Sequence, residues 1–91
     1  QARGIAICGS GIGVSIAVNR FDWIRAALVS EVTSARLCRE HNDANVLALG
    51  QRLTGIAVAL ECVDTFMATA FQGGRHQGRV DKLAGLHGGQ D

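Results

Sequence analysis

One stretch near the start of the chain, residues 4–13, limits the fold more than any other part of the sequence. Its apolar run at residues 5–7 is long enough for a buried strand and too short for a helix. A loop with glycine at positions 9, 11 and 13 follows at once, and residues 14–20 then carry a helical pattern. Such a loop binds anions readily, because its amides are unobstructed and the helix start carries partial positive charge. The stretch therefore predicts an α/β protein with a ligand-binding loop.

A single thiol, Cys8, lies where this strand meets the loop. Loop amides and the helix dipole favour the thiolate, so we expect the pKa of Cys8 to be lowered. The alternative is a small buried core residue, which is the usual place of a free cysteine. A glycine loop that binds no ligand is a second alternative, since such loops are common in α/β folds.

A dinucleotide site is another interpretation of the loop. Its fingerprint is G-x-G-x-x-G, followed about 20 residues later by an acid. Glu31 is suitably placed, but residues 9–13 follow the pattern G-x-G-x-G, and Val14 stands where the third glycine is needed. The sequence disfavours this interpretation and leaves it as an alternative.

Strands and helices alternate along the rest of the chain. We expect strands at residues 24–29 and 46–49, and helices at 32–41, 56–71 and 75–86, with a tail from about residue 85. Ser30 and Thr33 are candidate N-caps of the helix at 32–41. The alternation is typical of a parallel sheet with crossover helices, so residues 1–91 are predicted to form a single domain. Its first strand is expected to leave one edge open.

Composition excludes several classes of function. A formal net charge of +1 and only four aromatic residues argue against a nucleic-acid partner. No apolar run approaches the roughly 18 residues of a membrane span. Three widely spaced cysteines fit a reducing, cytoplasmic environment better than a disulfide framework. Neither C-x-x-C nor H-E-x-x-H occurs, so we expect no metal and no cofactor.

Four further residues have side chains suited to ligand chemistry. His41 ends a predicted helix, where it either interacts with the helix dipole or transfers protons near neutral pH. Arg52 follows the third strand, at the end where parallel sheets bind ligands. Arg75 and Arg79 are four residues apart and share a helix face, which suits a phosphate, a carboxylate or simply solvent.

Three stretches resemble the ribose-5-phosphate isomerase B family, which includes the galactose-6-phosphate isomerase subunits. The strand and glycine loop at 4–13 are similar to the family's active-site loop. Residues 34–50 are similar to its segment S-A-R-x-x-R-E-H-N-D-A-N-V-L-x-L-G, and residues 71–79 to its ending F-x-G-G-R-H-x-x-R. The middle stretch is the most specific, and the resemblance covers residues 4–83.

The resemblance implies a Rossmann-like three-layer α/β/α sandwich and an aldose–ketose isomerase, with ribose 5-phosphate and ribulose 5-phosphate of the pentose phosphate pathway as the preferred pair. It implies that Cys8 moves a proton between C1 and C2 through an enediolate, that Ser10 assists, and that His41 opens the sugar ring. It also implies the residues that hold the substrate: Gly9, Gly11, Ile12, Gly13, Asn42, Arg52, Arg75 and Arg79. Family members form dimers or tetramers with shared sites, and an isomerase needs Cys8 and His41 to converge.

The chain departs from the family at its start. The family begins with a strand that ends in an Asp-His pair, and this chain, which opens on Gln1, has no such segment. We therefore expect a truncated part of the sandwich, inactive by itself. Two alternatives remain open: an isomerase of another C4–C6 sugar phosphate, and a non-catalytic module that binds a sugar phosphate or nucleotide.

Overall fold

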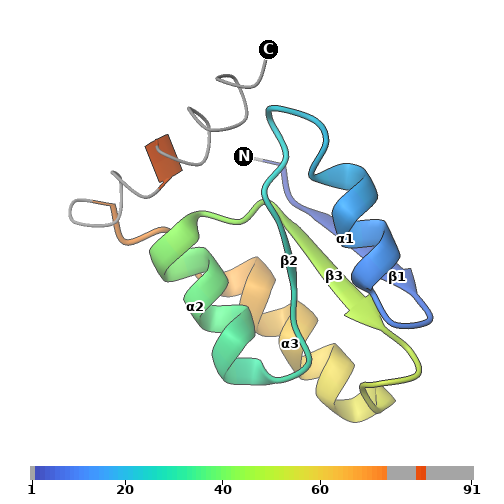
Figure 1. Cartoon of the computed structure of the whole chain (residues 1–91). Helices are drawn as coiled ribbons and strands as arrows, with labels where there is room; N and C mark the ends of the chain where they lie inside the picture. Colours follow the sequence, from blue (N-terminus) through green and yellow to red (C-terminus); the bar gives the residue numbers. More distant parts are fainter. Residues whose placement is uncertain (1, 74–79, 82–91) are drawn as a thin grey trace.

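Three strands and three helices alternate along the chain in the computed structural model, which describes residues 2–73 and 80–81 (Figure 1). The alternation predicted from the sequence is thereby confirmed. The elements in chain order are β1 (Gly4–Cys8), α1 (Ile12–Val18), β2 (Ala26–Leu28), α2 (Val32–Asn42), β3 (Val46–Gly50) and α3 (Ile56–Ala68).

The strands form one parallel sheet in the order β1-β3-β2. The chain crosses β3 through α1 on its way from β1 to β2, and returns through α2 to the centre. Because parallel crossovers are right-handed, these two opposite crossings place α1 on one face of the sheet and α2 on the other. α3 packs beside α2, as Figure 1 shows. The result is the predicted three-layer α/β/α sandwich.

The core lies between β3 and the pair of helices α2 and α3. Leu47 of the central strand, together with Cys62 and Phe66 of α3, is fully buried. α2 contributes Ala35 and Cys38 from the apolar stripe seen in its sequence. Since β3 is hydrogen-bonded on both sides and covered by helices, its residues are apolar without alternation, as in other buried parallel strands.

The N-cap of α2 is Glu31, so the prediction of Ser30 or Thr33 was wrong. The two carboxylate oxygens of Glu31 accept hydrogen bonds from the amides of Thr33 and Ser34, each at 2.7 Å. The Ser34 hydroxyl donates to the same carboxylate, and this bond contributes most to lowering the pKa of Glu31. A carboxylate satisfies two free helix amides, whereas a serine or threonine hydroxyl would satisfy one.

Three element boundaries also differ from the sequence predictions. α1 begins at Ile12, because Gly11 in the left-handed region acts as its N-cap. β2 is limited to Ala26–Leu28. α3 ends at Ala68, before the predicted end at residue 71, because Thr69 adopts extended backbone (φ −96°, ψ 127°). A hydrophobic pattern can continue past a helix end when the following residues still pack on the core.

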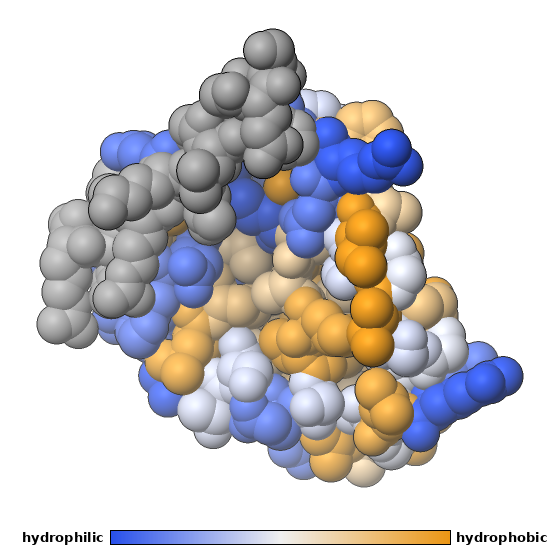
Figure 2. Space-filling view, in the orientation of Figure 1, coloured by the Kyte–Doolittle hydropathy of each residue, from blue (hydrophilic) through white to orange (hydrophobic). Residues whose placement is uncertain are grey.

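The sheet has β1 at one side and β2 at the other, and each pairs only with β3 within the described residues. The open edge expected for the first strand is therefore present, and Ile7 of β1 is 61% exposed. Figure 2 shows hydrophobic residues gathered in the middle of the face seen in Figure 1. A strand edge with apolar neighbours at the surface favours pairing with a further segment of chain.

The last predicted helix, residues 75–86, falls outside the described residues except for Val80 and Asp81, which are helical, and Val80 is buried. Arg75, Arg79 and the tail from about residue 85 also lie outside the described residues. In the part of the chain that the structure describes, every helix is too short or too polar to cross a membrane.

Candidate active site

The glycine loop and the end of β3 meet at the carboxyl end of the sheet, as the sequence predicted. Cys8 and Gly50 are register partners at the ends of their strands. Beyond them, the amide of Gln51 donates to the Cys8 carbonyl at 2.8 Å and the amide of Arg52 donates to the Gly9 carbonyl at 2.9 Å. The two connections after β1 and β3 therefore form one surface, where parallel α/β proteins usually bind ligands.

Two glycines make the close approach of these connections feasible. Gly11 has φ +79°, and a Cβ there would lie 2.4 Å from the Leu28 side chain. A Cβ on Gly50 would lie 2.4 Å from the carbonyl carbon and oxygen of Ser10. Any larger residue at position 50 would therefore push the loop away from the end of β3.

The loop folds back on the thiol of Cys8. The amide of Gly11 donates a hydrogen bond to Sγ at 3.1 Å. Backbone N–H groups of Val14, Gly11 and Ser10 lower the pKa of Cys8, with Val14 contributing most, while partial burial opposes them. The pKa is therefore lowered, as predicted from its place before a helix N-terminus. By contrast, burial raises the pKa of Cys38 to about 11 and also raises that of Cys62.

We expect iodoacetamide to alkylate Cys8 well before Cys38 and Cys62. Alkylation requires the thiolate, and Cys8 alone of the three has a lowered pKa, so its rate should rise with pH through a midpoint below that of an ordinary thiol. Peptide mass spectrometry after timed labelling at several pH values measures each rate. Denatured protein provides the control, in which all three cysteines should react alike. Equal labelling of the folded protein would contradict the lowered pKa.

Polar groups surround this loop. The Ser10 hydroxyl oxygen accepts a hydrogen bond from the Ile12 amide at 3.3 Å. A Cβ on Gly9 would lie 3.6 Å from Nε of Arg52, so the Arg52 side chain runs along the loop as its position in the sequence suggested. A cavity of about 190 Å³ adjoins Ser10, Gly50 and Thr54. Sequence reasoning did not select Thr54, which is 8% exposed and whose Oγ1 has no hydrogen-bond partner among the described residues.

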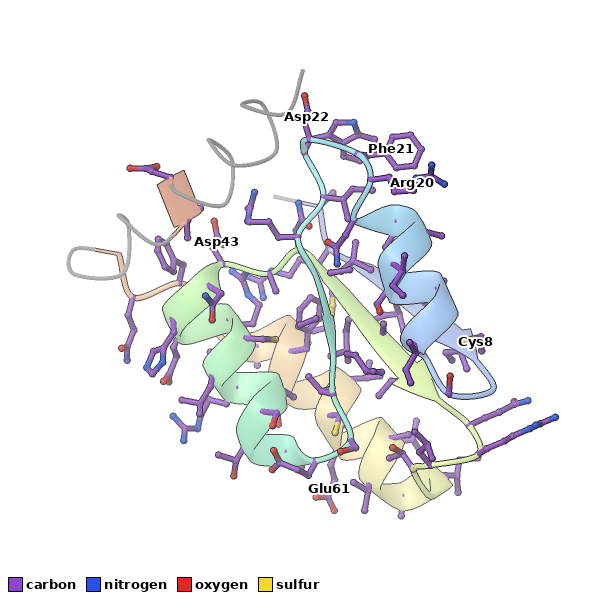
Figure 3. The ribbon with its side chains drawn as sticks, viewed as in Figure 1. Cys8, Arg20, Phe21, Asp22, Asp43 and Glu61 are labelled. Carbon is purple, nitrogen blue, oxygen red and sulfur yellow. The ribbon has the colours of Figure 1, made fainter. Side chains whose placement is uncertain are left out.

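His41 and Asn42 lie at the other end of the sheet. They close α2, which runs back to the amino end, where β3 starts. Figure 3 shows the separation: Cys8 and Asp43, the residue after Asn42, are at opposite ends of the molecule. One copy of the described chain therefore does not bring Cys8 and His41 together. Asn42 instead lines a larger cavity, of about 360 Å³, at the amino end.

In the structure, Glu31, the acid that a dinucleotide site would need, caps α2 instead. Both oxygens of the Glu31 carboxylate accept hydrogen bonds from amides of the first turn of α2. A ribose would have to compete with those bonds, which hold the helix start. The residues described here also contain no group of three or more His, Cys, Asp or Glu side chains able to hold a metal ion.

The fold and this surface define a class: parallel α/β proteins with the carboxyl ends of the strands at a surface of the kind that usually binds ligands, here carrying a thiol with a lowered pKa. The family model described as Ribose/Galactose Isomerase matches residues 1–83. The chain belongs to the ribose/galactose isomerase family, which confirms the resemblance seen in its motifs.

Individual relatives agree with this assignment. The ribose-5-phosphate isomerase B of Escherichia coli is 49% identical over 83 residues, a match that covers 91% of this chain and 56% of that protein. The structure of the ribose-5-phosphate isomerase B of Clostridium thermocellum has a TM-score of 0.95 at 50% identity, over 98% of this chain and 60% of that one. The type B enzyme of Leishmania infantum has a TM-score of 0.93 at 43% identity, over 98% and 59%. The chain thus spans somewhat more than half the length of these relatives.

Proposed function

We propose that this chain supplies the thiol half of an isomerase active site that interconverts ribose 5-phosphate and ribulose 5-phosphate. The observation that carries the proposal is the Cys8 thiol, hydrogen-bonded by the Gly11 amide at the carboxyl end of the sheet. A base with a lowered pKa in this position is suited to removing a proton next to a carbonyl group. The names of the relatives, which include ribose-5-phosphate isomerase B, support the choice of reaction.

In the proposed reaction, the Cys8 thiolate removes the proton from C2 of the open-chain aldose. The electron pair moves into a C1–C2 double bond, and the resulting enediolate takes the negative charge on oxygen. Return of the proton to C1, together with transfer of the O2 hydroxyl proton to O1, gives the ketose with its carbonyl at C2, so no oxidant or cofactor is consumed. Amides of the loop at Gly9, Gly11, Ile12 and Gly13 stabilise the oxyanion, because they are held in place before the charge develops. The Ser10 hydroxyl assists the reaction near the sugar oxygens.

We further propose that His41 and Asn42 reach Cys8 from a second copy in a homodimer or tetramer. Their position at the C-terminal end of α2, at the amino end of the sheet and away from Cys8, supports a site shared between copies. His41 would open the sugar ring and Asn42 would hold the substrate. Arg52 would bind it from the Cys8 side, and Arg75 and Arg79, which lie outside the described residues, would bind the phosphate. We place the reaction in the cytoplasm, within the pentose phosphate pathway.

We expect the 91-residue chain to be inactive alone and to self-associate, and to gain isomerase activity when it follows the N-terminal portion of a relative. The exposed edge of β1 lacks a partner strand among the described residues, and orientation of substrate by a complete pocket accounts for a large share of catalysis. Light scattering measures the mass of both proteins. A coupled assay of ribulose 5-phosphate formation measures their activity.

The N-terminal portion of the relative alone is the control for activity brought in by the fusion. A folded chimaera without turnover would contradict the isomerase proposal. Calorimetric binding of ribose 5-phosphate to that inactive chimaera would favour the alternative of a non-catalytic sugar-phosphate module. A preference for a tetrose or hexose phosphate would correct the substrate while keeping the reaction.

A further inference from the structure

Three charged side chains form a cluster at the C-terminal end of α2, where His41 and Asn42 are the last two residues of the helix. The members of this Asp43 cluster are Arg25, Arg39 and Asp43. The Asp43 carboxylate accepts from Arg39 Nη1 at 2.8 Å through one oxygen and from Arg25 Nη2 at 3.3 Å through the other. Arg25 Nε also donates to the Asp43 carbonyl at 2.9 Å. Every acceptor atom of Asp43 is therefore engaged by an arginine.

The backbone of Asp43 sets the end of the helix. It is the C-cap of α2, in the left-handed region with φ 49° and ψ 42°. Among the described residues other than glycine it is the one with positive φ. Its amide donates to the Arg39 carbonyl at 3.2 Å. Aspartate tolerates this conformation better than most residues, so the choice of Asp here serves both the turn and the cluster.

Arg39 connects the turn to a second helix. Its side chain is 3% exposed, and Nε donates to the Thr69 carbonyl at 3.0 Å, just after α3. Its guanidinium also lies over the Phe66 ring, 5.9 Å from the centroid. A buried arginine must be paired, and removing its partner leaves an uncompensated charge. Asp43 is the carboxylate that pairs with it.

Arg25 connects the same turn to the sheet. It immediately precedes β2, and its amide donates a hydrogen bond to Oδ1 of Asn45 at 2.8 Å. Through Arg25 and Arg39, one carboxylate thus fixes the end of α2 to the start of β2 and the end of α3. Asn42 and Arg25 line the same cavity of about 360 Å³, so the fixed turn borders accessible space.

We propose that Asp43 is a positioning residue that, through Arg25 and Arg39, fixes the orientation of His41 and Asn42 toward a substrate. This inference rests on the proposed function, in which those two residues contact the sugar. Asp43 itself does not need to touch substrate. Its carboxylate holds a turn whose displacement by about 1 Å would cost roughly 100-fold in rate.

The test uses Asp43→Asn, which keeps the left-handed turn and the size of the side chain but removes the charge. The variant is made in the chimaera described above, once that protein is shown to be active. We expect kcat/KM for ribose 5-phosphate to fall by about 10- to 100-fold. The rate of Cys8 alkylation should be unchanged, because Cys8 lies at the opposite end of the sheet. Arg36→Gln is the matched control: it removes the ion pair with Glu40 on the same helix and should leave kcat/KM unchanged.

A second measurement separates positioning from a general loss of folded protein. Exchange of the C1 hydrogen of ribulose 5-phosphate with D₂O needs proton transfer by Cys8, whereas consumption of ring-closed ribose 5-phosphate also needs His41. We expect Asp43→Asn to raise the ratio of exchange to consumption by about 10-fold or more. Loss of folded protein would lower both rates equally and leave the ratio unchanged, which would overturn the inference.

Asp43→Gly provides a variant with a favourable turn and no carboxylate, and it should show the same rise in the ratio. Unchanged kinetics in both variants would also overturn the role of Asp43. If the chimaera of the unmodified chain with the N-terminal portion of a relative shows no isomerase activity, the proposed function is rejected instead. The two failures are therefore distinguished before any variant is compared.

Discussion

Replacing Cys8 with alanine should lower kcat by at least about 100-fold in the active form of the protein, because loss of a general base usually has an effect of that size or more. The thiol is the group that receives the hydrogen bond from Gly11 and has the lowered pKa. Serine at this position should be nearly as inactive, since a hydroxyl is far more difficult to ionise. Steady-state kinetics on both variants measure the effect.

Cys62→Ser is not a suitable control, because Cys62 is fully buried in the core. Thermal unfolding of each Cys8 variant is more informative, since Cys8 lies at the surface end of β1 and its replacement should change the unfolding temperature little. Turnover of Cys8→Ala close to that of the unmodified protein would show that another group is the base.

Gly50→Ala should also lower kcat/KM by about 100-fold, although residue 50 supplies no side chain to the reaction. A Cβ at this position would overlap the Ser10 backbone at 2.4 Å, and backbone cannot rotate away as a side chain can. The loop would have to shift by a distance comparable to the overlap, which moves its amides and the hydrogen bond to Cys8. We also expect a loss of about 1–3 kcal/mol in unfolding free energy from overpacking.

Gly55→Ala is the matched control for that substitution. A Cβ on Gly55 meets no atom within 4 Å and its φ is −64°, so the change is sterically free. The variant should keep its activity and unfold at the same temperature or slightly higher. If Gly50→Ala retains full activity, the close approach of Ser10 to β3 is not required for the geometry of the loop.

Local patterns in the sequence were sufficient for the order of the elements that the structure describes and for one end of the sheet. The short apolar run before the glycines predicted β1, and parallel pairing then placed Cys8 and Arg52 together, because the carboxyl ends of parallel strands meet. The lowered pKa of Cys8 followed from the same reasoning, since it depends on amides within six residues of the thiol.

Features that depend on contacts between distant residues were beyond these patterns. The capping role of Glu31 was missed because a serine and a threonine beside it fit the usual preference. The pairing of Arg39 with Asp43 has helical spacing, but the contact of Arg39 with Thr69 joins residues 30 positions apart. The separation of His41 from Cys8 follows from the direction of α2, which a list of motifs does not convey.

The strand order β1-β3-β2 has a consequence for how the chain folds. β1 and β2 are not neighbours, so neither has a hydrogen-bonded strand partner among the described residues until β3 arrives. Gly4 pairs with Val46, 42 positions along the chain, which makes sheet formation a long-range event with a substantial loop-closure cost. During synthesis, residues 4–45 would leave the ribosome before either pairing with β3 can form. Chains interrupted before residue 46 are therefore expected to lack both strand pairings described here, whereas addition of the five residues of β3 lets β1 and β2 both pair with it in one step.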